Sequence, residues 1–489
     1  MLKKLMILLV ATSFAAAPIT SIFAQEKTSE PLFEYSEINH PVVGKKGMVA
    51  SHNALSSEIT AEIMRKGGNA IDAGAAIGFA LAVTLPRAGN IGGGGFMLVH
   101  VAKLNKTITI DFRETAPAAA HKDMFFDKDG NVSNAEYRFT HKSSAVPGSV
   151  AGLAHIVEKY GTMTLAEVLE PAIRLARDGI SVTYDLAADL SRSERLKNNP
   201  ASLKKFYKSD GSNYEVGELF KQPDLAWTLS EIAKNGVDAF YKGSIAKKIV
   251  ADMEAHNGLV TMEDLAAYKV IEREPVRGTF RGYDIAAVPA PSSGGTHVIQ
   301  MLNILENFPL AEMGPGSAAA LHITAEAMKL SYADRSKYLG DPDFVDIPTE
   351  ALISKDYAKS LAAKISMDRA TPSDEIAPGN LAIYESDETT HYSIMDDEGN
   401  IVGNTYTLMF SFGSGVVIEG TGILMNNNLG NFTLRPDIPD AFGLMGSENN
   451  MIQAYKRPVS SMSPIIISKD GKPFLVTGTP GGSKIISAN

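Results

Sequence analysis

The segment TTHYSIMDDEGNIVGNTYTL (residues 389–408) marks an abrupt change of pattern along the chain. Helix-like stretches dominate the sequence before it, whereas here two runs of strand-forming residues flank the turn Asp-Glu-Gly-Asn at 397–400. Such a pair of runs predicts a β-hairpin. The segment SPIIISKDGKPFLVTG (463–478) predicts a second hairpin, with its turn at Asp470-Gly471. Helices followed by hairpins predict an α+β fold in which helices cover sheets.

The sequence upstream of residue 389 contains further periodic segments. Residues 57–83 predict two helices separated at Gly67-Gly68, with Asn69 as the N-cap of the second. That second helix consists almost entirely of small and apolar residues, which predicts deep burial. Other predicted helices cover 149–160, 164–177 and 317–336, and predicted strands cover 96–101, 107–110 and 278–288.

The composition bounds the class of protein. The chain has 489 residues, of which 44% are hydrophobic, and a formal net charge of −10. This length and composition predict a globular protein with a substantial core, either one large layered domain or two to three domains. Without a basic cluster, nucleic acid is not expected as a partner. The chain contains no cysteine, so disulfides and thiol catalysis are excluded.

The first 24 residues have the pattern of a secretory signal peptide. Lys3 and Lys4 precede an apolar run from Leu5 to Ala17, and small residues lead to a predicted cleavage after Ala24. The apolar run is too short to favour a permanent anchor. We therefore expect a secreted, periplasmic protein without a stable membrane anchor.

Metal and nucleotide motifs are missing from the sequence. The ten histidines are scattered, and no HExxH or acidic calcium loop occurs, so no metal or other cofactor is expected. The glycine run 92–95 and the segment GTPGGSK (478–484) both lack the order of a phosphate-binding loop. Their glycines are interpreted instead as allowing close backbone contact or as directing N–H groups at an oxyanion.

Thr389 is a candidate nucleophile. A threonine hydroxyl reacts poorly unless a base removes its proton, and no GxSxG elbow surrounds this residue. If the bond between Glu388 and Thr389 were cut, the new α-amine, with a pKa near ~8, would be such a base. The alternative is an ordinary strand threonine, and the hydroxyl alone does not distinguish the two.

Several motifs occur together in a fixed order: NAIDAGAA, NIGGGGF, DFRETAP, VPGSVAG, PAPSSGG, TTHYS, TYTL, RPVSSMSP and TPGGSK. In this order they resemble the γ-glutamyltransferases, also called glutathione hydrolases, over nearly all of the chain after the leader. The resemblance implies a four-layer αββα sandwich of the N-terminal-nucleophile hydrolase type. It also implies a precursor that cleaves itself into a large subunit (25–388) and a small subunit (389–489). Such enzymes act on glutathione and other γ-glutamyl compounds, with water or an amino acid or peptide as acceptor.

The resemblance assigns roles to individual residues. Thr389 would be the nucleophile, and its amine the base, after autocleavage at Glu388. Thr407 would support the nucleophile, and Gly481 and Gly482 would stabilise the oxyanion. The expected substrate-binding residues are Arg113, Asn428, Asn431, Ser460 and Ser461, of which Arg113 and the two serines would hold the substrate α-carboxylate.

Some positions depart from the family pattern. Met409 stands where the family usually has asparagine, Asn431 where it has aspartate, and Asn428 where glutamine is common. Losing the carboxylate that faces the substrate ammonium would weaken γ-glutamyl binding by ~1.5–3 kcal/mol. A glutaryl-type acylase, as among the related cephalosporin acylases, is therefore the alternative function. Phe442 lies in a segment that resembles the family's lid over the pocket.

The C-terminal end is a further departure. The sequence stops at Asn489, shortly after the glycine pair, whereas related chains continue through a helix and further strands. The expectation is that the C-terminal part of the sandwich is truncated. An inactive or unprocessed homologue is therefore a second alternative.

Overall fold

The computed structural model describes residues 41–376, 389–440 and 442–489. Residues 45–489 form one compact unit, and of the chain before it only residues 41–44 are described. The predicted leader and Glu388 lie outside the described residues. Among the helices that are described, none has the length and apolar character needed to cross a membrane.

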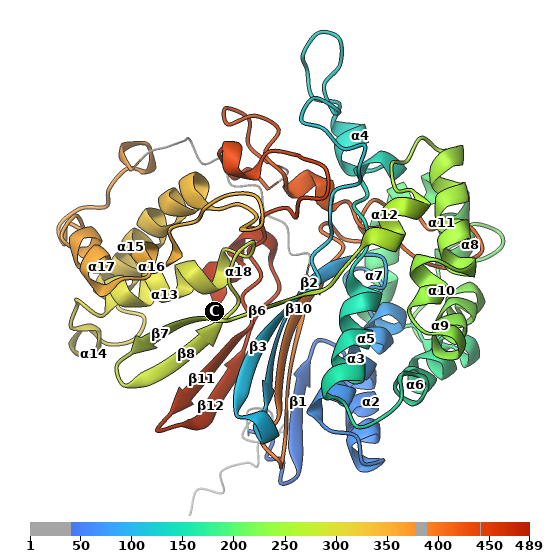
Figure 1. The fold of residues 1–489 in the computed structure, drawn as a ribbon, viewed down its shortest axis with the longest axis horizontal. Helices are drawn as coiled ribbons and strands as arrows, with labels where there is room; N and C mark the ends of the chain where they lie inside the picture. Colours follow the sequence, from blue (N-terminus) through green and yellow to red (C-terminus); the bar gives the residue numbers. More distant parts are fainter. Residues whose placement is uncertain (1–40, 377–388, 441) are drawn as a thin grey trace, which may run out of the picture. The chain divides into compact units, whose positions relative to one another are not determined.

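The larger sheet of the described chain has six antiparallel strands, in the order β1-β9-β10-β2-β3-β6 (Figure 1). Its strands are β1 (Gly47–Ser51), β2 (Gly94–Val101), β3 (Lys106–Asp111), β6 (Ile271–Arg273), β9 (Thr390–Asp396) and β10 (Ile401–Thr407). The hairpin predicted at 389–408 is confirmed as β9 and β10. Its turn contains Gly399 at φ 88°, a left-handed conformation that glycine adopts without steric cost.

The smaller sheet has four antiparallel strands, in the order β12-β11-β8-β7. They are β7 (Val276–Phe280), β8 (Tyr283–Ala287), β11 (Ile465–Lys469) and β12 (Lys472–Thr477). The second predicted hairpin is confirmed, but the single strand predicted at 278–288 is wrong. That segment turns back at Arg281-Gly282, which have φ of 49° and 83°. A separate two-stranded sheet pairs β4 (Ile180–Ser181) with β5 (Leu219–Phe220).

Helix α3 anchors the larger sheet to the helices beside it. Asn69 caps it in a reciprocal capping box with Asp72, and every residue from Ala70 to Thr84 is buried. The hydroxyls of Tyr392 and Tyr406 donate to backbone carbonyls of α3, at 2.6 and 2.9 Å. The prediction of a deeply buried helix after Asn69 is confirmed, and the buried tyrosines hold the central hairpin against it.

Two groups of helices flank the sheets (Figure 1). The group on the side of the larger sheet comprises α2 (Ala54–Arg65), α3 (Ala70–Thr84), α5 (Ser149–Tyr160), α6 (Leu165–Asp178), α7 (Tyr184–Arg192), α8 (Pro200–Phe206), α9 (Pro223–Asn235), α10 (Asp238–Tyr241), α11 (Ser244–Ala255) and α12 (Met262–Ala267). The group on the side of the smaller sheet comprises α13 (Gly294–Leu305), α14 (Leu310–Met313), α15 (Ala318–Tyr338), α16 (Thr349–Leu352) and α17 (Lys355–Ala362). Two short helices, α4 (Asn134–Arg138) and α18 (Ile485–Ala488), complete the described set.

The two sheets share a hydrophobic cluster. Helices α3 and α5 pack against β9, β10 and β2, whereas α13 packs against β7 and β8. Strand β12 contacts both β9 and β10, so the smaller sheet lies against the larger one. The buried residues of the cluster are Phe96, Leu98, Val288, Ile401, Met462, Ile466 and Ile485. The larger sheet therefore packs against both helices and the smaller sheet.

Candidate active site

Thr389 and Thr407 lie opposite each other at one end of the central hairpin. Strands β9 and β10 pair Thr390 with Tyr406, and the same register places Thr389 across from Thr407. Both threonines are buried, with 4% of each exposed. The Thr407 hydroxyl accepts the backbone N–H of Met409 at 3.0 Å. The candidate nucleophile thus immediately precedes a central strand, beside the threonine predicted to support it.

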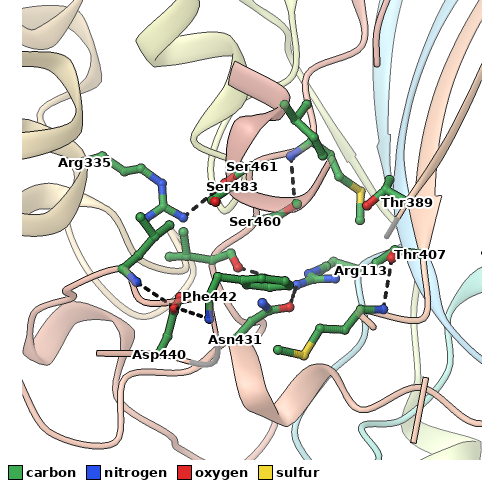
Figure 2. A pocket seen from close by; sticks show the side chains of 16 residues that line it. Arg113, Arg335, Thr389, Thr407, Asn431, Asp440, Phe442, Ser460, Ser461 and Ser483 are labelled. Atoms are coloured by element: carbon green, nitrogen blue, oxygen red, sulfur yellow. Dashed lines mark hydrogen bonds between the residues drawn. The ribbon is translucent and has the colours of Figure 1, made fainter. Parts of the chain in front are cut away.

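A pocket opens beside this pair (Figure 2). It is lined by Arg113, Arg335, Thr389, Thr407, Met409, Asn431, Asp440, Phe442, Leu444, Val459, Ser460, Ser461, Met462, Gly482, Ser483 and Ile485. Seven of the predicted site residues are in this set: Thr389, Thr407, Arg113, Asn431, Ser460, Ser461 and Gly482. Asn428 and Gly481 are not on the wall, and Glu388 is outside the described residues. The fold therefore gathers most of the predicted site from distant segments of the sequence.

Arg113 and Glu114 form a buried ion pair behind the pocket. Arg113 follows β3, and its Nη1 lies 3.0 Å from Oε2 of Glu114. The side chains are 1% and 0% exposed. Burial raises the pKa of Glu114, because a buried carboxylate loses its hydration, while the neighbouring guanidinium works against that rise. Each charge therefore depends on the other for compensation.

The guanidinium of Arg113 has five N–H donors, and all of them have acceptors. The acceptors are Pro458 O at 3.3 Å, Glu114 Oε2 at 3.0 Å, Asn428 Oδ1 at 3.1 Å, Asn431 Oδ1 at 2.7 Å and Val459 O at 3.5 Å. The side-chain amide of Asn428 also donates to Glu114. Asn428 thus braces the ion pair from behind, whereas Asn431 reaches the pocket. A substrate carboxylate that binds Arg113 has to replace one of these acceptors.

The hydroxyls of Ser460 and Ser461 both accept hydrogen bonds from the protein. Ser460 Oγ accepts the backbone N–H of Met462 at 3.1 Å. Ser461 Oγ accepts from Nη2 of Arg335 at 3.3 Å. A hydroxyl has one hydrogen of its own to donate. Within the described chain, neither serine hydroxyl donates to another protein group, so both hydrogens remain available to a ligand.

The glycine pair predicted to stabilise the oxyanion adopts positive φ values. Gly481 has φ 129° and Gly482 has φ 54°, conformations that residues with a side chain rarely adopt. Gly481 is the N-cap of the short 3-10 helix Gly482–Lys484, whose first residue lines the pocket. Among the described residues, neither glycine N–H has an acceptor, so both are available as hydrogen-bond donors.

The glycine run 92–95 brings backbones close together. A Cβ on Gly93 would lie 2.1 Å from the carbonyl oxygen of Thr407, and a Cβ on Gly94 would lie 2.5 Å from that of Phe112. Gly93 O also accepts the N–H groups of Gly148 and Ser149. The run therefore packs against the backbone at Thr407 and at Phe112, the residue before Arg113, which agrees with the prediction of close backbone contact.

Met409 and Phe442 form an apolar side of the pocket. Met409 has φ 87°, a left-handed conformation that asparagine adopts more readily than methionine. Phe442 is 8% exposed, and its ring centroid lies 5.3 Å from that of Phe410. Phe442 therefore packs beside Phe410, and its role in a lid stays a prediction.

The sequence interpretation missed two charged residues of the pocket, Arg335 and Asp440. Arg335 lies on α15, and Asp440 lies in a loop, two residues before Phe442. The Asp440 carboxylate accepts the backbone N–H groups of Phe442 and Leu444 at 2.8 and 2.9 Å. Burial raises the pKa of Asp440 to about 6, against the opposing effect of Arg335. Neither residue belongs to a motif with a chemical signature, so only its position in the fold identifies it.

His391, two residues after the candidate nucleophile, is buried within the larger sheet. Its ring nitrogens lie 2.8 Å from Thr405 Oγ1 and 2.9 Å from Ser393 Oγ. Burial lowers the pKa of His391 to about 3, because no described acidic group compensates its charge. The imidazole is therefore neutral throughout the physiological pH range.

We expect His391 to make the protein sensitive to acid. The pKa of His391 is lower in the folded than in the unfolded chain, so at low pH the unfolded chain binds a proton that the folded chain does not. The folded state is therefore at its most stable, with respect to this residue, above the unfolded pKa of 6.5, and it loses stability as the pH falls. At pH 5 the free energy of unfolding should have lost about 2 kcal/mol through this residue. Urea unfolding of wild type and His391→Gln at pH 7.5 and pH 5 measures this. An equal loss in both proteins would contradict the prediction.

Outside the pocket, the described residues include one group of close metal-ligating atoms, His141, Asp252 and His256. The carboxylate of Asp252 lies 3.1 Å from His141 Nε2 and 3.4 Å from His256 Nδ1. The two imidazole rings are stacked, with centroids 4.5 Å apart and planes 11° from parallel. An imidazole binds a metal through a lone pair in its ring plane. Stacked rings do not direct these lone pairs at one point, so the geometry fits hydrogen bonding to Asp252 instead.

Known proteins are similar to this chain in sequence and in fold. The chain is 51% identical, over 453 residues, to the glutathione hydrolase proenzyme of Escherichia coli (strain K12), covering 92% of this chain and 78% of the relative. It is 36% identical, over 458 residues, to the acylase ACY 1 proenzyme of Pseudomonas sp. (strain SE83), covering 91% of this chain and 78% of that one. The crystal structure of Helicobacter pylori gamma-glutamyltranspeptidase matches with a TM-score of 0.68 and 45% identity, covering 70% of this chain and 99% of that one.

A model of the gamma-glutamyltranspeptidase family matches residues 56–489. The match contains both strands of the central hairpin and every residue that lines the pocket. Together with the relatives, it establishes the family from the sequence, and the arrangement around Thr389 agrees with it. This chain belongs to the gamma-glutamyltranspeptidase family.

Proposed function

We propose that the chain is a self-processing hydrolase and transferase that acts on glutathione and other γ-glutamyl compounds through a threonine acyl-enzyme. The observation that carries the proposal is the position of Thr389. It immediately precedes a central strand, opposite Thr407, and it lines a pocket that also contains Arg113 and the serine pair. The similarity to glutathione hydrolase proenzymes supports the same activity.

The mechanism begins with cleavage between Glu388 and Thr389, which separates a large subunit (25–388) from a small subunit (389–489). The freed α-amine takes the hydroxyl proton as Thr389 Oγ1 bonds to the γ-carbonyl carbon. The N–H groups of Gly481 and Gly482 stabilise the oxyanion of the tetrahedral intermediate, a contribution of about 3–4 kcal/mol in comparable sites. The leaving amine then takes the proton, and the acyl ester remains on the enzyme.

Water or the amine of an amino acid or peptide completes the reaction. The acceptor loses a proton to the Thr389 α-amine as it attacks the ester carbonyl. Collapse of the intermediate returns that proton to Thr389 Oγ1 and releases either free acid or a new amide. Arg113, Ser460 and Ser461 hold the substrate α-carboxylate meanwhile, with Arg113 exchanging one of its present acceptors for it.

The fold and the leader extend the proposal. Helices on the larger sheet, the two sheets face to face, and α13 on the smaller sheet support a four-layer αββα sandwich of the N-terminal-nucleophile hydrolase type. Residues 1–24 would direct the precursor to the periplasm and be removed there. The mature enzyme would have no stable membrane anchor.

Purified protein tests the proposal directly. Intact mass and N-terminal sequencing should find a fragment that begins at Thr389, and this preparation should hydrolyse a γ-glutamyl anilide. An active preparation without such a fragment would rule out the mechanism. A processed preparation without γ-glutamyl activity would rule out the substrate class.

A glutaryl-type acylase is the second candidate function, and Asn431 favours it. Asn431 brings an uncharged amide to the pocket where an ammonium group would need a carboxylate. Glutaryl and γ-glutamyl donors differ only in the α-amine. A glutaryl donor has no ammonium group to pair, so the missing carboxylate weakens its binding less. Similarity to the acylase ACY 1 proenzyme is consistent with this reading.

Asn431→Asp should shift the preference toward γ-glutamyl donors. The carboxylate can keep the 2.7 Å hydrogen bond from Arg113 and adds a negative charge for the substrate ammonium. A charged hydrogen bond of ~1.5–3 kcal/mol corresponds to a rise of about 10- to 100-fold in the ratio of kcat/KM for γ-glutamyl over glutaryl anilide. Asn235→Asp, exposed and outside the pocket, is the control for added charge. An unchanged ratio in Asn431→Asp would exclude this role.

A further inference from the structure

Arg335 places a second guanidinium in the pocket of Thr389 (Figure 2). It projects from α15, and only 9% of it is exposed. Its Nε donates to Ser293 Oγ at 3.0 Å and its Nη2 to Ser461 Oγ at 3.3 Å. A guanidinium has five N–H donors, so these two bonds leave three without a protein acceptor among the described residues. Arg335 therefore retains donors for a ligand, whereas those of Arg113 are all occupied.

The charge of Arg335 lacks a close carboxylate partner. In the described part of the chain, no carboxylate oxygen lies within 4.0 Å of this guanidinium, whereas Arg113 has Glu114 at 3.0 Å. The Asp440 carboxylate compensates this charge in part, but it also accepts the backbone N–H groups of Phe442 and Leu444. A buried cation is costly unless an anion compensates it. The pocket around Arg335 is therefore suited to an anionic ligand.

Arg335 also determines how the neighbouring hydroxyls are oriented. Because Ser461 Oγ accepts from the guanidinium, the serine hydrogen has to point away from Arg335. Ser293, the other acceptor of Arg335, donates its own hydrogen to the backbone carbonyl of Ser460 at 2.7 Å. The guanidinium thus fixes the side chain of Ser461 and, through Ser293, the backbone of Ser460. Both serines line the pocket that contains Thr389.

We propose that Arg335 is a positioning residue for substrates that carry a carboxylate at the end of the acyl group remote from the scissile amide. It orients the Ser461 hydroxyl to donate to that carboxylate, and its charge compensates the carboxylate within the pocket. The inference rests on the proposed amidohydrolase function and deepens it. It divides carboxylate recognition between two guanidinium groups, one on each side of the serine pair.

Two donors that differ only in this carboxylate test the inference: γ-glutamyl anilide and 4-aminobutyryl anilide. Arg335→Met should raise KM for the γ-glutamyl donor by about tenfold or more, the scale of one charged hydrogen bond. KM for 4-aminobutyryl anilide should change by less than about twofold, because that donor has no carboxylate to lose. A structural defect would impair both donors alike, so equal effects on the two would overturn the inference.

Milder variants test the same role in case Arg335→Met is not cleaved before Thr389. Ser293→Ala removes one acceptor of the guanidinium and should show the same selective rise in KM to a smaller degree. In addition, Ser461→Ala should add little in the Arg335→Met background, since the two residues act on one contact. Full additivity, or no selectivity in Ser293→Ala, would contradict the inference.

The wild-type enzyme separates this inference from the proposed function. If processed wild type hydrolyses neither anilide and no glutaryl anilide, the proposed function fails. If wild type is active, and the ratio of the KM values for the two donors is the same in Arg335→Met as in wild type, only the role of Arg335 fails. Appearance of the Thr389 N-terminus and an unchanged melting temperature show that each variant has folded.

Discussion

Thr389→Ala is expected to accumulate as one uncleaved chain with no measurable amidase activity. Alanine removes the hydroxyl that forms the acyl-enzyme, and without cleavage the α-amine that serves as its base is never released. Loss of a covalent nucleophile lowers kcat by about 10⁴-fold or more in comparable enzymes. Intact mass spectrometry and hydrolysis of γ-glutamyl anilide measure the two effects. A cleaved and active Thr389→Ala protein would end the proposal.

The neighbouring threonine provides a matched control. Thr390 is fully buried, and its Oγ1 has no hydrogen-bond partner within the described chain. Thr390→Val keeps the shape and removes an unsatisfied polar atom, so cleavage and activity should persist. Thr389→Ser, which retains the hydroxyl, should still be processed. If Thr390→Val instead blocked cleavage, the assignment of the nucleophile to Thr389 alone would be wrong.

Arg113→Leu should destabilise the fold by about 3–5 kcal/mol, because it leaves Glu114 buried without a compensating charge. The loss should be larger at pH 8 than at pH 5, because a carboxyl group whose pKa is raised by burial can protonate at the lower pH. Urea unfolding at the two pH values measures this. Binding of γ-glutamyl donors should also weaken, since a cation beside the carboxylate site is lost.

The double variant Arg113→Leu/Glu114→Gln separates charge from shape. Removing both charges should recover much of the stability lost in Arg113→Leu, although donor binding should remain weak. The exposed pair Arg177 and Asp178, also adjacent in sequence and 2.8 Å apart, is the control. Arg177→Leu should leave the unfolding transition unchanged, because water solvates Asp178 on its own. Equal losses in Arg113→Leu and Arg177→Leu would refute the buried-pair argument.

Sequence patterns predicted the secondary structure well where a helix is specified by its own cap and by the periodic spacing of its apolar residues. The helix predicted at 149–160 is α5 (Ser149–Tyr160), and the capped helix after Asn69 is α3. Both are specified by residues within a few positions of each other. The prediction of one strand at 278–288 was wrong because Arg281 adopts a left-handed conformation, which the residue type arginine does not predict.

Only those residues of the candidate site that belong to recognisable motifs could be predicted from the sequence. Thr389 was a candidate from its own sequence context, whereas Thr407, Arg113 and the serine pair came from a family resemblance, and the fold brings them to one pocket. Arg335 and Asp440 carry no such signal, since one is an arginine on a long helix and the other an aspartate in a loop. Asn428 illustrates the converse, because it braces the buried ion pair without reaching the pocket wall.

The sequence by itself determined the order of helices and hairpins, the family, and the choice of Thr389 as the candidate nucleophile. These features depend on residue types at short spacing or on motifs in a fixed order. Only the tertiary structure decided that Arg113 is saturated by its own neighbours while Arg335 keeps donors for a ligand. Hydrogen-bond saturation and burial depend on atoms that are hundreds of positions apart in the chain, so they exist only once the sheets and helices have packed.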